Sequence, residues 1–100
     1  MQSGATGPAI LDALGDPIRR LIYQRLSRRP SNVTNLAKGV PVSRSAVSHH
    51  LRVLRDALLV DVEVEGRHRV YSLRREGLEP LQGWIAEIGA ARAAASGGRT

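Results

Sequence analysis

Polar and titratable side chains recur on one face of a helix predicted at residues 44–57. At about 100° per residue, Ser45, His49 and Arg52 fall together on this face, and Ser48 lies at its edge. The opposite side carries an apolar stripe about 60° wide, made of Val47, Leu51, Leu54 and Leu58. The polar face offers hydrogen-bond donors and acceptors and little apolar surface. Such a face suits contact with the edges of bases in a DNA major groove.

A short basic segment follows this helix. Arg67, His68 and Arg69 come directly after Gly66, at the tip of a predicted two-stranded ribbon. A run of charge is in many proteins only a solvated hairpin tip, but these residues stand beside the polar helix. A short basic ribbon in that position suits a phosphate backbone or a minor groove. The two elements together are typical of a DNA-recognition helix followed by a wing.

The start of the helix extends this candidate surface. Ser43 is expected to cap the helix, and a capped helix N-terminus also faces phosphate favourably. His50 lies nearer to the apolar stripe, so we expect it to pack inward with its ring bonded to a neighbour. The candidate DNA-binding residues are Ser43, Arg44, Ser45, Ser48, His49, Arg52, Arg67, His68 and Arg69.

Start and stop signals along the chain predict the other elements. The predicted elements are helices at 8–14, 17–26, 33–38 and 44–57, strands at 60–64 and 68–73 joined around Glu65-Gly66, and a last helix from about residue 75. Asp16 and Asn32 are the expected N-caps of the second and third helices. The fold class is therefore mostly α with a small β-hairpin, in the order ααααββα: a winged helix-turn-helix. We expect this domain at 8–95, between flexible tails at 1–7 and 96–100.

Composition limits the classes of protein that the chain can represent. At 100 residues it is long enough for one domain, and its net charge of +6 favours a polyanionic partner. It has no cysteine, which excludes disulfides, thiolate metal ligands and cysteine catalysis. Neither a secretory signal nor an apolar run long enough to span a membrane is visible, so we expect a cytoplasmic location and no membrane partner. Because no nucleophile–base constellation can be assembled from these residues, we do not expect an enzyme.

Three segments resemble the ArsR-type winged helix-turn-helix repressors. They are LGDPIRRLIYQRL at 14–26, NLAKGVPVSRSAVSHHLRVLRDALLV at 35–60 and EGRHRVYSL at 65–73, and the resemblance covers about residues 10–88. The most specific motif is Ser-(two residues)-Ser-His-His-Leu-(two residues)-Leu at 45–54. The segment EGLEPLQGWI at 76–85 resembles the last helix of a subgroup without metal ligands.

The resemblance implies a homodimer built from the first and last helices, which binds an imperfect palindrome in promoter DNA as a repressor. The 3-4-3 spacing of the apolar residues in the last helix independently suits a helix–helix seam. Trp84 lies beside this seam, where it could line a small hydrophobic site, although we favour the interface. The predicted interface residues are Ile10, Leu14, Leu78, Leu81, Trp84, Ile85 and Ile88.

The chain departs from the family at the metal-sensing positions. The family's metal sensors use a Cys-Val-Cys-type motif in the third helix or Asp/His pairs in the last helix. The third helix here reads NVTNLAK, and the last helix offers only Glu76, Glu79 and Glu87. We therefore predict no metal site and no cofactor, and leave open an unknown effector or partner protein. The alternatives to a regulator are a protein–protein interaction module and a non-specific architectural DNA binder.

Overall fold

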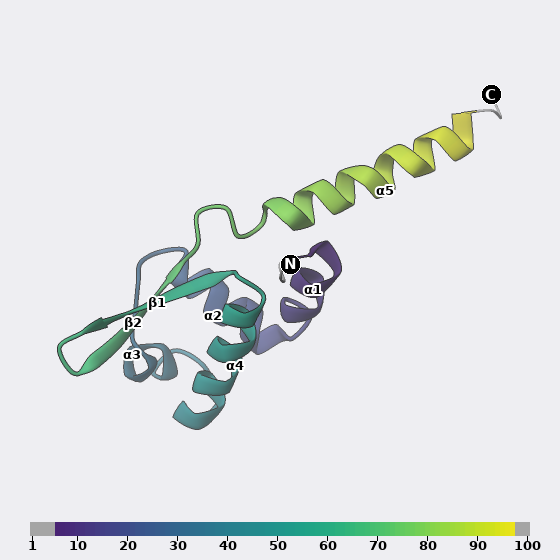
Figure 1. The fold of residues 1–100 in the computed structure, drawn as a ribbon. Helices are drawn as coiled ribbons and strands as arrows, with labels where there is room; N and C mark the ends of the chain where they lie inside the picture. Colours follow the sequence, from purple (N-terminus) through teal and green to yellow (C-terminus); the bar gives the residue numbers. More distant parts are fainter. Residues whose placement is uncertain (1–5, 98–100) are drawn as a thin grey trace.

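The computed structural model describes residues 6–97, so 1–5 and 98–100 of the predicted tails lie outside the described residues. Its elements are α1 (Gly7–Ala13), α2 (Pro17–Leu26), α3 (Val33–Ala37), α4 (Arg44–Asp56), β1 (Val60–Glu65), β2 (His68–Leu73) and α5 (Glu79–Gly97). Figure 1 shows helices α1 to α4 gathered in one body, with the β-hairpin extending from one side and α5 from the other. The molecule is accordingly elongated, 60 × 31 × 21 Å. The predicted fold class and element order are confirmed.

Side-chain caps begin four of the helices, among them α2 and α3. The Asp16 carboxylate accepts hydrogen bonds from the backbone N–H groups of Ile18 and Arg19, at 2.8 and 3.1 Å. The Asn32 side chain accepts one from the N–H of Asn35 at 2.8 Å. Each cap satisfies a donor that the first turn of a helix leaves without a partner. Both predicted caps are confirmed.

A single apolar core joins the helices to the base of the hairpin. The side chains of Val47, Leu51 and Leu54 are 0% exposed and form the inner stripe of α4. The core consists of Ile10, Ala13, Ile22, Leu26, Leu36, Val40, Val47, Leu51, Leu54, Ala57, Leu59, Val60 and Tyr71. Burying this apolar surface is the main source of stability, and it fixes which face of α4 points outward.

The prediction that Leu58 continues the buried stripe of α4 is wrong. Helix α4 ends at Asp56, and Leu58 has a φ of 60° and is 36% exposed. The N–H groups of Leu58 and Leu59 donate to the carbonyls of Arg55 and Leu54, both at 2.9 Å. These two bonds close the helix with a left-handed residue, which turns the chain and buries Leu59 in place of Leu58.

The hairpin turns one residue later than predicted. Glu65 belongs to β1 and pairs with His68 of β2, so the turn consists of Gly66 and Arg67. Gly66 has a φ of 62°, which a glycine adopts without strain at this turn position. At the other end of β2, the side chain of Tyr71 is buried in the core. Its backbone exchanges two hydrogen bonds with Ser31, at 3.0 and 2.9 Å.

Helix α5 begins at Glu79, four residues later than predicted, because the chain first makes a close turn at Gly77. A Cβ on Gly77 would lie 3.2 Å from the carbonyl oxygen of Leu58 and 3.3 Å from the Cα of Leu59. The backbone of this turn therefore packs directly on the segment after α4. Pro80 then lies in the first turn of α5, where its missing N–H costs nothing.

Helix α5 packs against α1 (Figure 1). Helix α1 begins at Gly7 and is capped by Thr6, so these two residues of the predicted tail belong to the fold. A Cβ on Gly7 would overlap the Cβ of Trp84, which means that the two helices touch at this point. Among the described residues, no helix is long and apolar enough to cross a membrane.

Candidate nucleic-acid interface

The outer face of α4 is polar and exposed along its length. The Ser43 hydroxyl accepts a hydrogen bond from the N–H of Ala46 at 3.1 Å, so the predicted cap is confirmed. Exposed side chains then follow at Arg44, Ser45, Ser48, His49 and Arg52. Their orientation away from the core was predicted from the helical period and is confirmed. The helix therefore presents hydroxyl, imidazole and guanidinium groups to solvent.

The structure brings the end of this face next to the hairpin. Ser48, Arg52 and Arg55 of α4 line a hollow of about 270 Å³ together with Arg69 of β2. Val33 and Tyr71 complete its lining. Three guanidinium groups from two elements thus surround one concavity, where they can hold an anionic backbone by paired hydrogen bonds.

Arg55 was missing from the predicted DNA-binding set, although its spacing would have revealed it. Ser48, Arg52 and Arg55 stand at positions i, i+4 and i+7, which lie on one side of a helix. The predicted face ended at Arg52. Arg55 now extends the basic surface to the last turn of α4.

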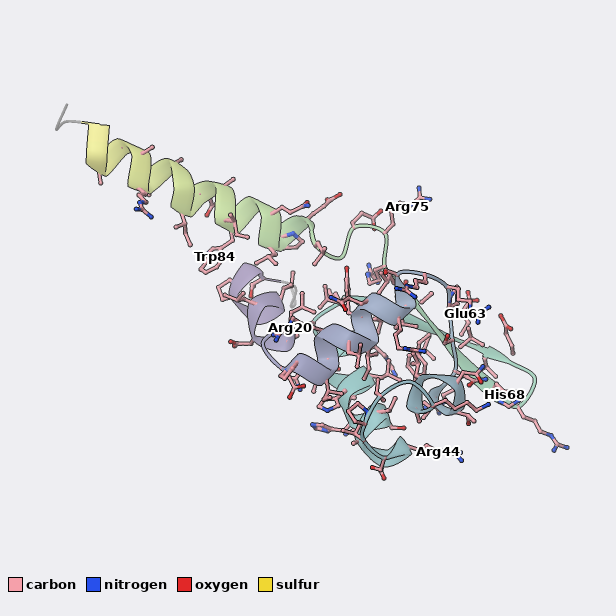
Figure 2. All side chains as sticks on the ribbon, turned by 180° about the vertical axis from the view of Figure 1, so that it is seen from behind. Arg20, Arg44, Glu63, His68, Arg75 and Trp84 are labelled. Atoms are coloured by element: carbon pink, nitrogen blue, oxygen red, sulfur yellow. The ribbon has the colours of Figure 1, made fainter. Side chains whose placement is uncertain are left out.

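The tip of the hairpin stands apart from this hollow. Arg67, His68 and Arg69 are all exposed, but only Arg69 lines the hollow. In Figure 2, His68 and Arg44 lie toward the end of the molecule opposite α5 and Trp84. Strand β1 places Glu63 and Glu65 opposite Val70 and His68 of β2. The positive charge of the hairpin is therefore confined to β2 and the turn.

His50 points away from the exposed face, as predicted for a packing histidine with a bonded ring. Its Nδ1 lies 3.2 Å from Nη1 of Arg19, and Arg19 Nε also donates to the carbonyl oxygen of Ala13 at 2.6 Å. Burial holds the pKa of His50 below its ordinary value, against the opposing charge of Asp16. His50 thus anchors α4 to α2, whereas His49 is exposed.

The predicted dimer residues fall into three groups. Ile10 is 0% exposed and belongs to the chain's own core, so its assignment to the interface is wrong. Leu14, Leu78, Leu81 and Trp84 are half-buried within the chain. Three apolar side chains on α1 and α5 remain about half exposed: Leu11 at 50%, Ile85 at 55% and Ile88 at 47%. Leu11, the next residue of α1, is the exposed one, whereas Ile10 lies in the core.

Residues 6–97 contain no group of three or more His, Cys, Asp or Glu side chains that could hold a metal ion. The two adjacent imidazoles, His49 and His50, have ring centroids 5.8 Å apart with the rings tilted by 57°. They diverge because consecutive residues on a helix point about 100° apart.

Comparison with known proteins identifies the family. A helix-turn-helix domain family matches residues 14–63. The chain is 49% identical over 70 residues to the HTH-type transcriptional regulator Rv2034 of Mycobacterium tuberculosis, covering 70% of this chain and 65% of that protein. It is 44% identical over 72 residues to the regulator NmtR of the same organism, covering 72% of this chain and 60% of that protein. The chain therefore spans less than two thirds of the length of these two relatives.

Solved structures extend the similarity to nearly the whole chain. The structure of an ArsR-like transcriptional regulator from Rhodococcus sp. RHA1 matches with a TM-score of 0.76 at 32% identity. The match covers 88% of this chain and 86% of that one. On the sequence motif, the fold and these relatives, the chain belongs to the ArsR-type family of winged helix-turn-helix transcriptional regulators.

Proposed function

We propose that this protein is a cytoplasmic transcriptional repressor that binds an imperfect palindrome in promoter DNA as a homodimer. The observation that carries the proposal is the joint surface of α4 and β2, where Arg52, Arg55 and Arg69 surround one hollow beside the exposed face of the helix. A basic concavity next to a hydrogen-bonding helix can hold phosphates and read bases at the same time.

In this proposal each part of the surface has its own role. Helix α4 enters the major groove, where Arg44 and His49 contact base edges and the hydroxyls of Ser45 and Ser48 supplement them. Ser43 faces the phosphates with the capped end of the helix. Arg52 and Arg55 hold the backbone alongside the groove. Arg67, His68 and Arg69 bind flanking phosphates or enter the adjoining minor groove.

A homodimer is supported by the apolar surface that α1 and α5 leave open. Leu11, Ile85 and Ile88 are exposed apolar side chains on two helices that pack against each other. In the proposed dimer a second copy covers these side chains, and the two α4 helices enter successive major grooves about 34 Å apart. The dimer would then repress by blocking the access of polymerase to the promoter.

A binding experiment separates this function from its alternatives. Fluorescence anisotropy would follow the chain on DNA from upstream of its own gene, against a scrambled competitor. Selective binding supports the repressor. Equal affinity for both sequences would favour an architectural DNA binder, and no binding would favour a protein–protein interaction module.

One substitution tests the proposed base contact. Arg44→Ala should cost about 1–3 kcal/mol of operator affinity and reduce the preference for operator over scrambled DNA. Arg75→Ala removes the same charge from an exposed position before α5, far from α4 in Figure 2, and should leave the preference unchanged. If both variants bind the operator like the wild type, our orientation of α4 on DNA is wrong.

A further inference from the structure

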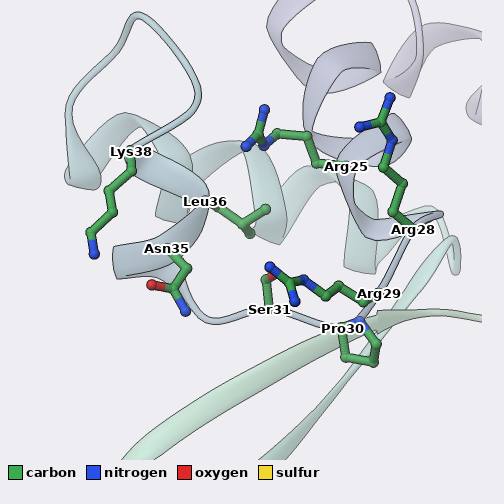
Figure 3. Close-up of a pocket in the computed structure, with 8 residues that line it drawn as sticks. All are labelled: Arg25, Arg28, Arg29, Pro30, Ser31, Asn35, Leu36 and Lys38. Carbon is green, nitrogen blue, oxygen red and sulfur yellow. The ribbon is translucent and has the colours of Figure 1, made fainter.

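A second, larger hollow lies on another side of α3. Its volume is about 580 Å³, and it shares no lining residue with the hollow at Arg52 and Arg69. The end of α2, the segment after it and α3 form its walls (Figure 3). The lining residues are Arg25, Arg28, Arg29, Pro30, Ser31, Asn35, Leu36 and Lys38.

Four of these eight residues carry a positive charge at neutral pH. Figure 3 shows Arg25 and Arg29 extending from α2 and from the segment after it toward α3, with Lys38 on the far side. Within the described part of the chain, no carboxylate forms an ion pair with any of the four, since the ion pair found there joins Arg74 to Asp61. Like charges gathered around one hollow without a counterion repel one another. An anion placed among them would remove that repulsion.

The backbone around this hollow is held in place by three contacts. Ser31 is joined to Tyr71 of β2 by backbone hydrogen bonds in both directions. Leu36 is 1% exposed and anchors α3 in the core. A Cβ on Gly39 would overlap the Arg25 guanidinium, so Arg25 lies directly over the turn between α3 and α4. The hollow is therefore preformed, which lowers the entropic cost of binding a ligand there.

We propose that this hollow binds a phosphate group. The guanidinium groups of Arg25, Arg28 and Arg29 can each donate two hydrogen bonds to phosphate oxygens, and Lys38 adds a point charge. The Asn35 amide adds a neutral donor. The phosphate comes either from a small phosphorylated molecule, which a hollow of this size accommodates, or from the backbone of DNA that runs past the domain. The second source rests on the proposed function.

The position of the hollow would connect phosphate binding to both DNA-binding elements. Arg25 lies over the turn that leads into α4, and Ser31 is hydrogen-bonded to the wing strand. A phosphate that draws Arg25, Arg28 and Arg29 together would act on the turn and on the base of the hairpin at once.

Calorimetry with inorganic phosphate and pyrophosphate tests the first source without DNA. At constant ionic strength, we expect saturable binding by the full chain. The pair Arg28→Gln with Arg29→Gln should weaken it by about tenfold or more. The pair Arg75→Gln with Arg92→Gln removes the same charge elsewhere and should bind as the wild type does. Far-UV circular dichroism checks that both pairs fold.

The salt dependence of DNA affinity tests the second source. If DNA supplies the phosphate, free phosphate does not saturate the hollow. The log–log slope then falls by about 0.9 for each phosphate that the Arg28/Arg29 pair no longer binds, and it stays the same in the control pair. The proposal is overturned if both readouts are the same for the two pairs. Because the calorimetry needs no DNA, a failure of the proposed repressor function would be seen separately.

Discussion

The contact between Gly7 and Trp84 makes a strong prediction for Gly7→Ala. A Cβ at position 7 would overlap the Cβ of Trp84 and lie 2.7 Å from its Cγ. Carbon atoms in contact are normally about 3.5–4.0 Å apart. Because the Cβ of Trp84 is attached to the backbone of α5, no change of rotamer can move it away. The substitution must therefore push α5 off α1.

Two contributions of opposite sign determine how much Gly7→Ala changes the free energy of unfolding. Alanine in a helix is up to about 1 kcal/mol more favourable than glycine. Overpacking of this kind costs about 1–3 kcal/mol. Gly83→Ala is the matched control, since it lies in α5 and its added Cβ would meet nothing within 4 Å. Both variants gain from the higher helix propensity of alanine, so most of this gain drops out when their free energies of unfolding are compared. Gly7→Ala should therefore be less stable than Gly83→Ala by about 1–3 kcal/mol.

Urea unfolding at several protein concentrations measures this difference. Trp84 is the chain's one tryptophan, so its fluorescence reports on the site of the clash, and circular dichroism reports on the whole fold. Displacement of α5 should also weaken the proposed dimer in sedimentation experiments. If Gly7→Ala and Gly83→Ala have the same free energy of unfolding, the two helices do not touch as closely as the structure has them.

Three further predictions concern the wing, the dimer and pH. Arg67→Ala with Arg69→Ala should weaken binding to all DNA sequences and reduce the salt-dependence slope by about 0.9 for each phosphate contact; an unchanged slope would remove the wing from the interface. Ile85→Lys should give a folded monomer in sedimentation, because Ile85 is 55% exposed in the single chain but would be buried between subunits; intact dimers would contradict this. Acid should destabilise the fold in two steps, because burial lowers the pKa of His50 and the N–H of Arg19 lowers the pKa of Asp16. Each group stabilises the fold above its unfolded-state pKa, about 6.5 and about 3.9, and this stability is lost as the pH falls through the folded-state value. His50→Gln should abolish the upper step in unfolding curves, and a step that persists would assign it to another group.

Features that depend on near neighbours could be predicted from the sequence. Asp16, Asn32 and Ser43 each bond to a backbone N–H two or three residues further on, so the residues that decide these caps stand together in the chain. The two faces of α4 were likewise predictable, because the helical period alone decides which side chains share a face. This local information was sufficient for most of the candidate DNA-binding surface.

Contacts between distant segments could not be predicted in the same way. The sequence predicts that Gly7 lies in a tail, because its contact with Trp84 of α5 exists only in the folded chain. In the sequence, Arg28 and Arg29 look only like the residues that follow a helix. The second hollow is formed because α3 folds alongside them. In each case the partner residue lies where no pattern of local spacing indicates it.

Arg19 links the surface proposed for dimerisation to the helix proposed for recognition. From α2, its Nε donates to the carbonyl oxygen of Ala13, the last residue of α1, and its Nη1 donates to Nδ1 of His50 on α4. A guanidinium has no acceptor, so the second bond requires an unprotonated Nδ1, in agreement with the lowered pKa of His50. Because α1 also carries the packing surface for α5, Arg19 is one route by which a shift of α5 would reach α4. The same shift would alter the distance between the two recognition helices of a dimer, on which the fit to a palindrome depends.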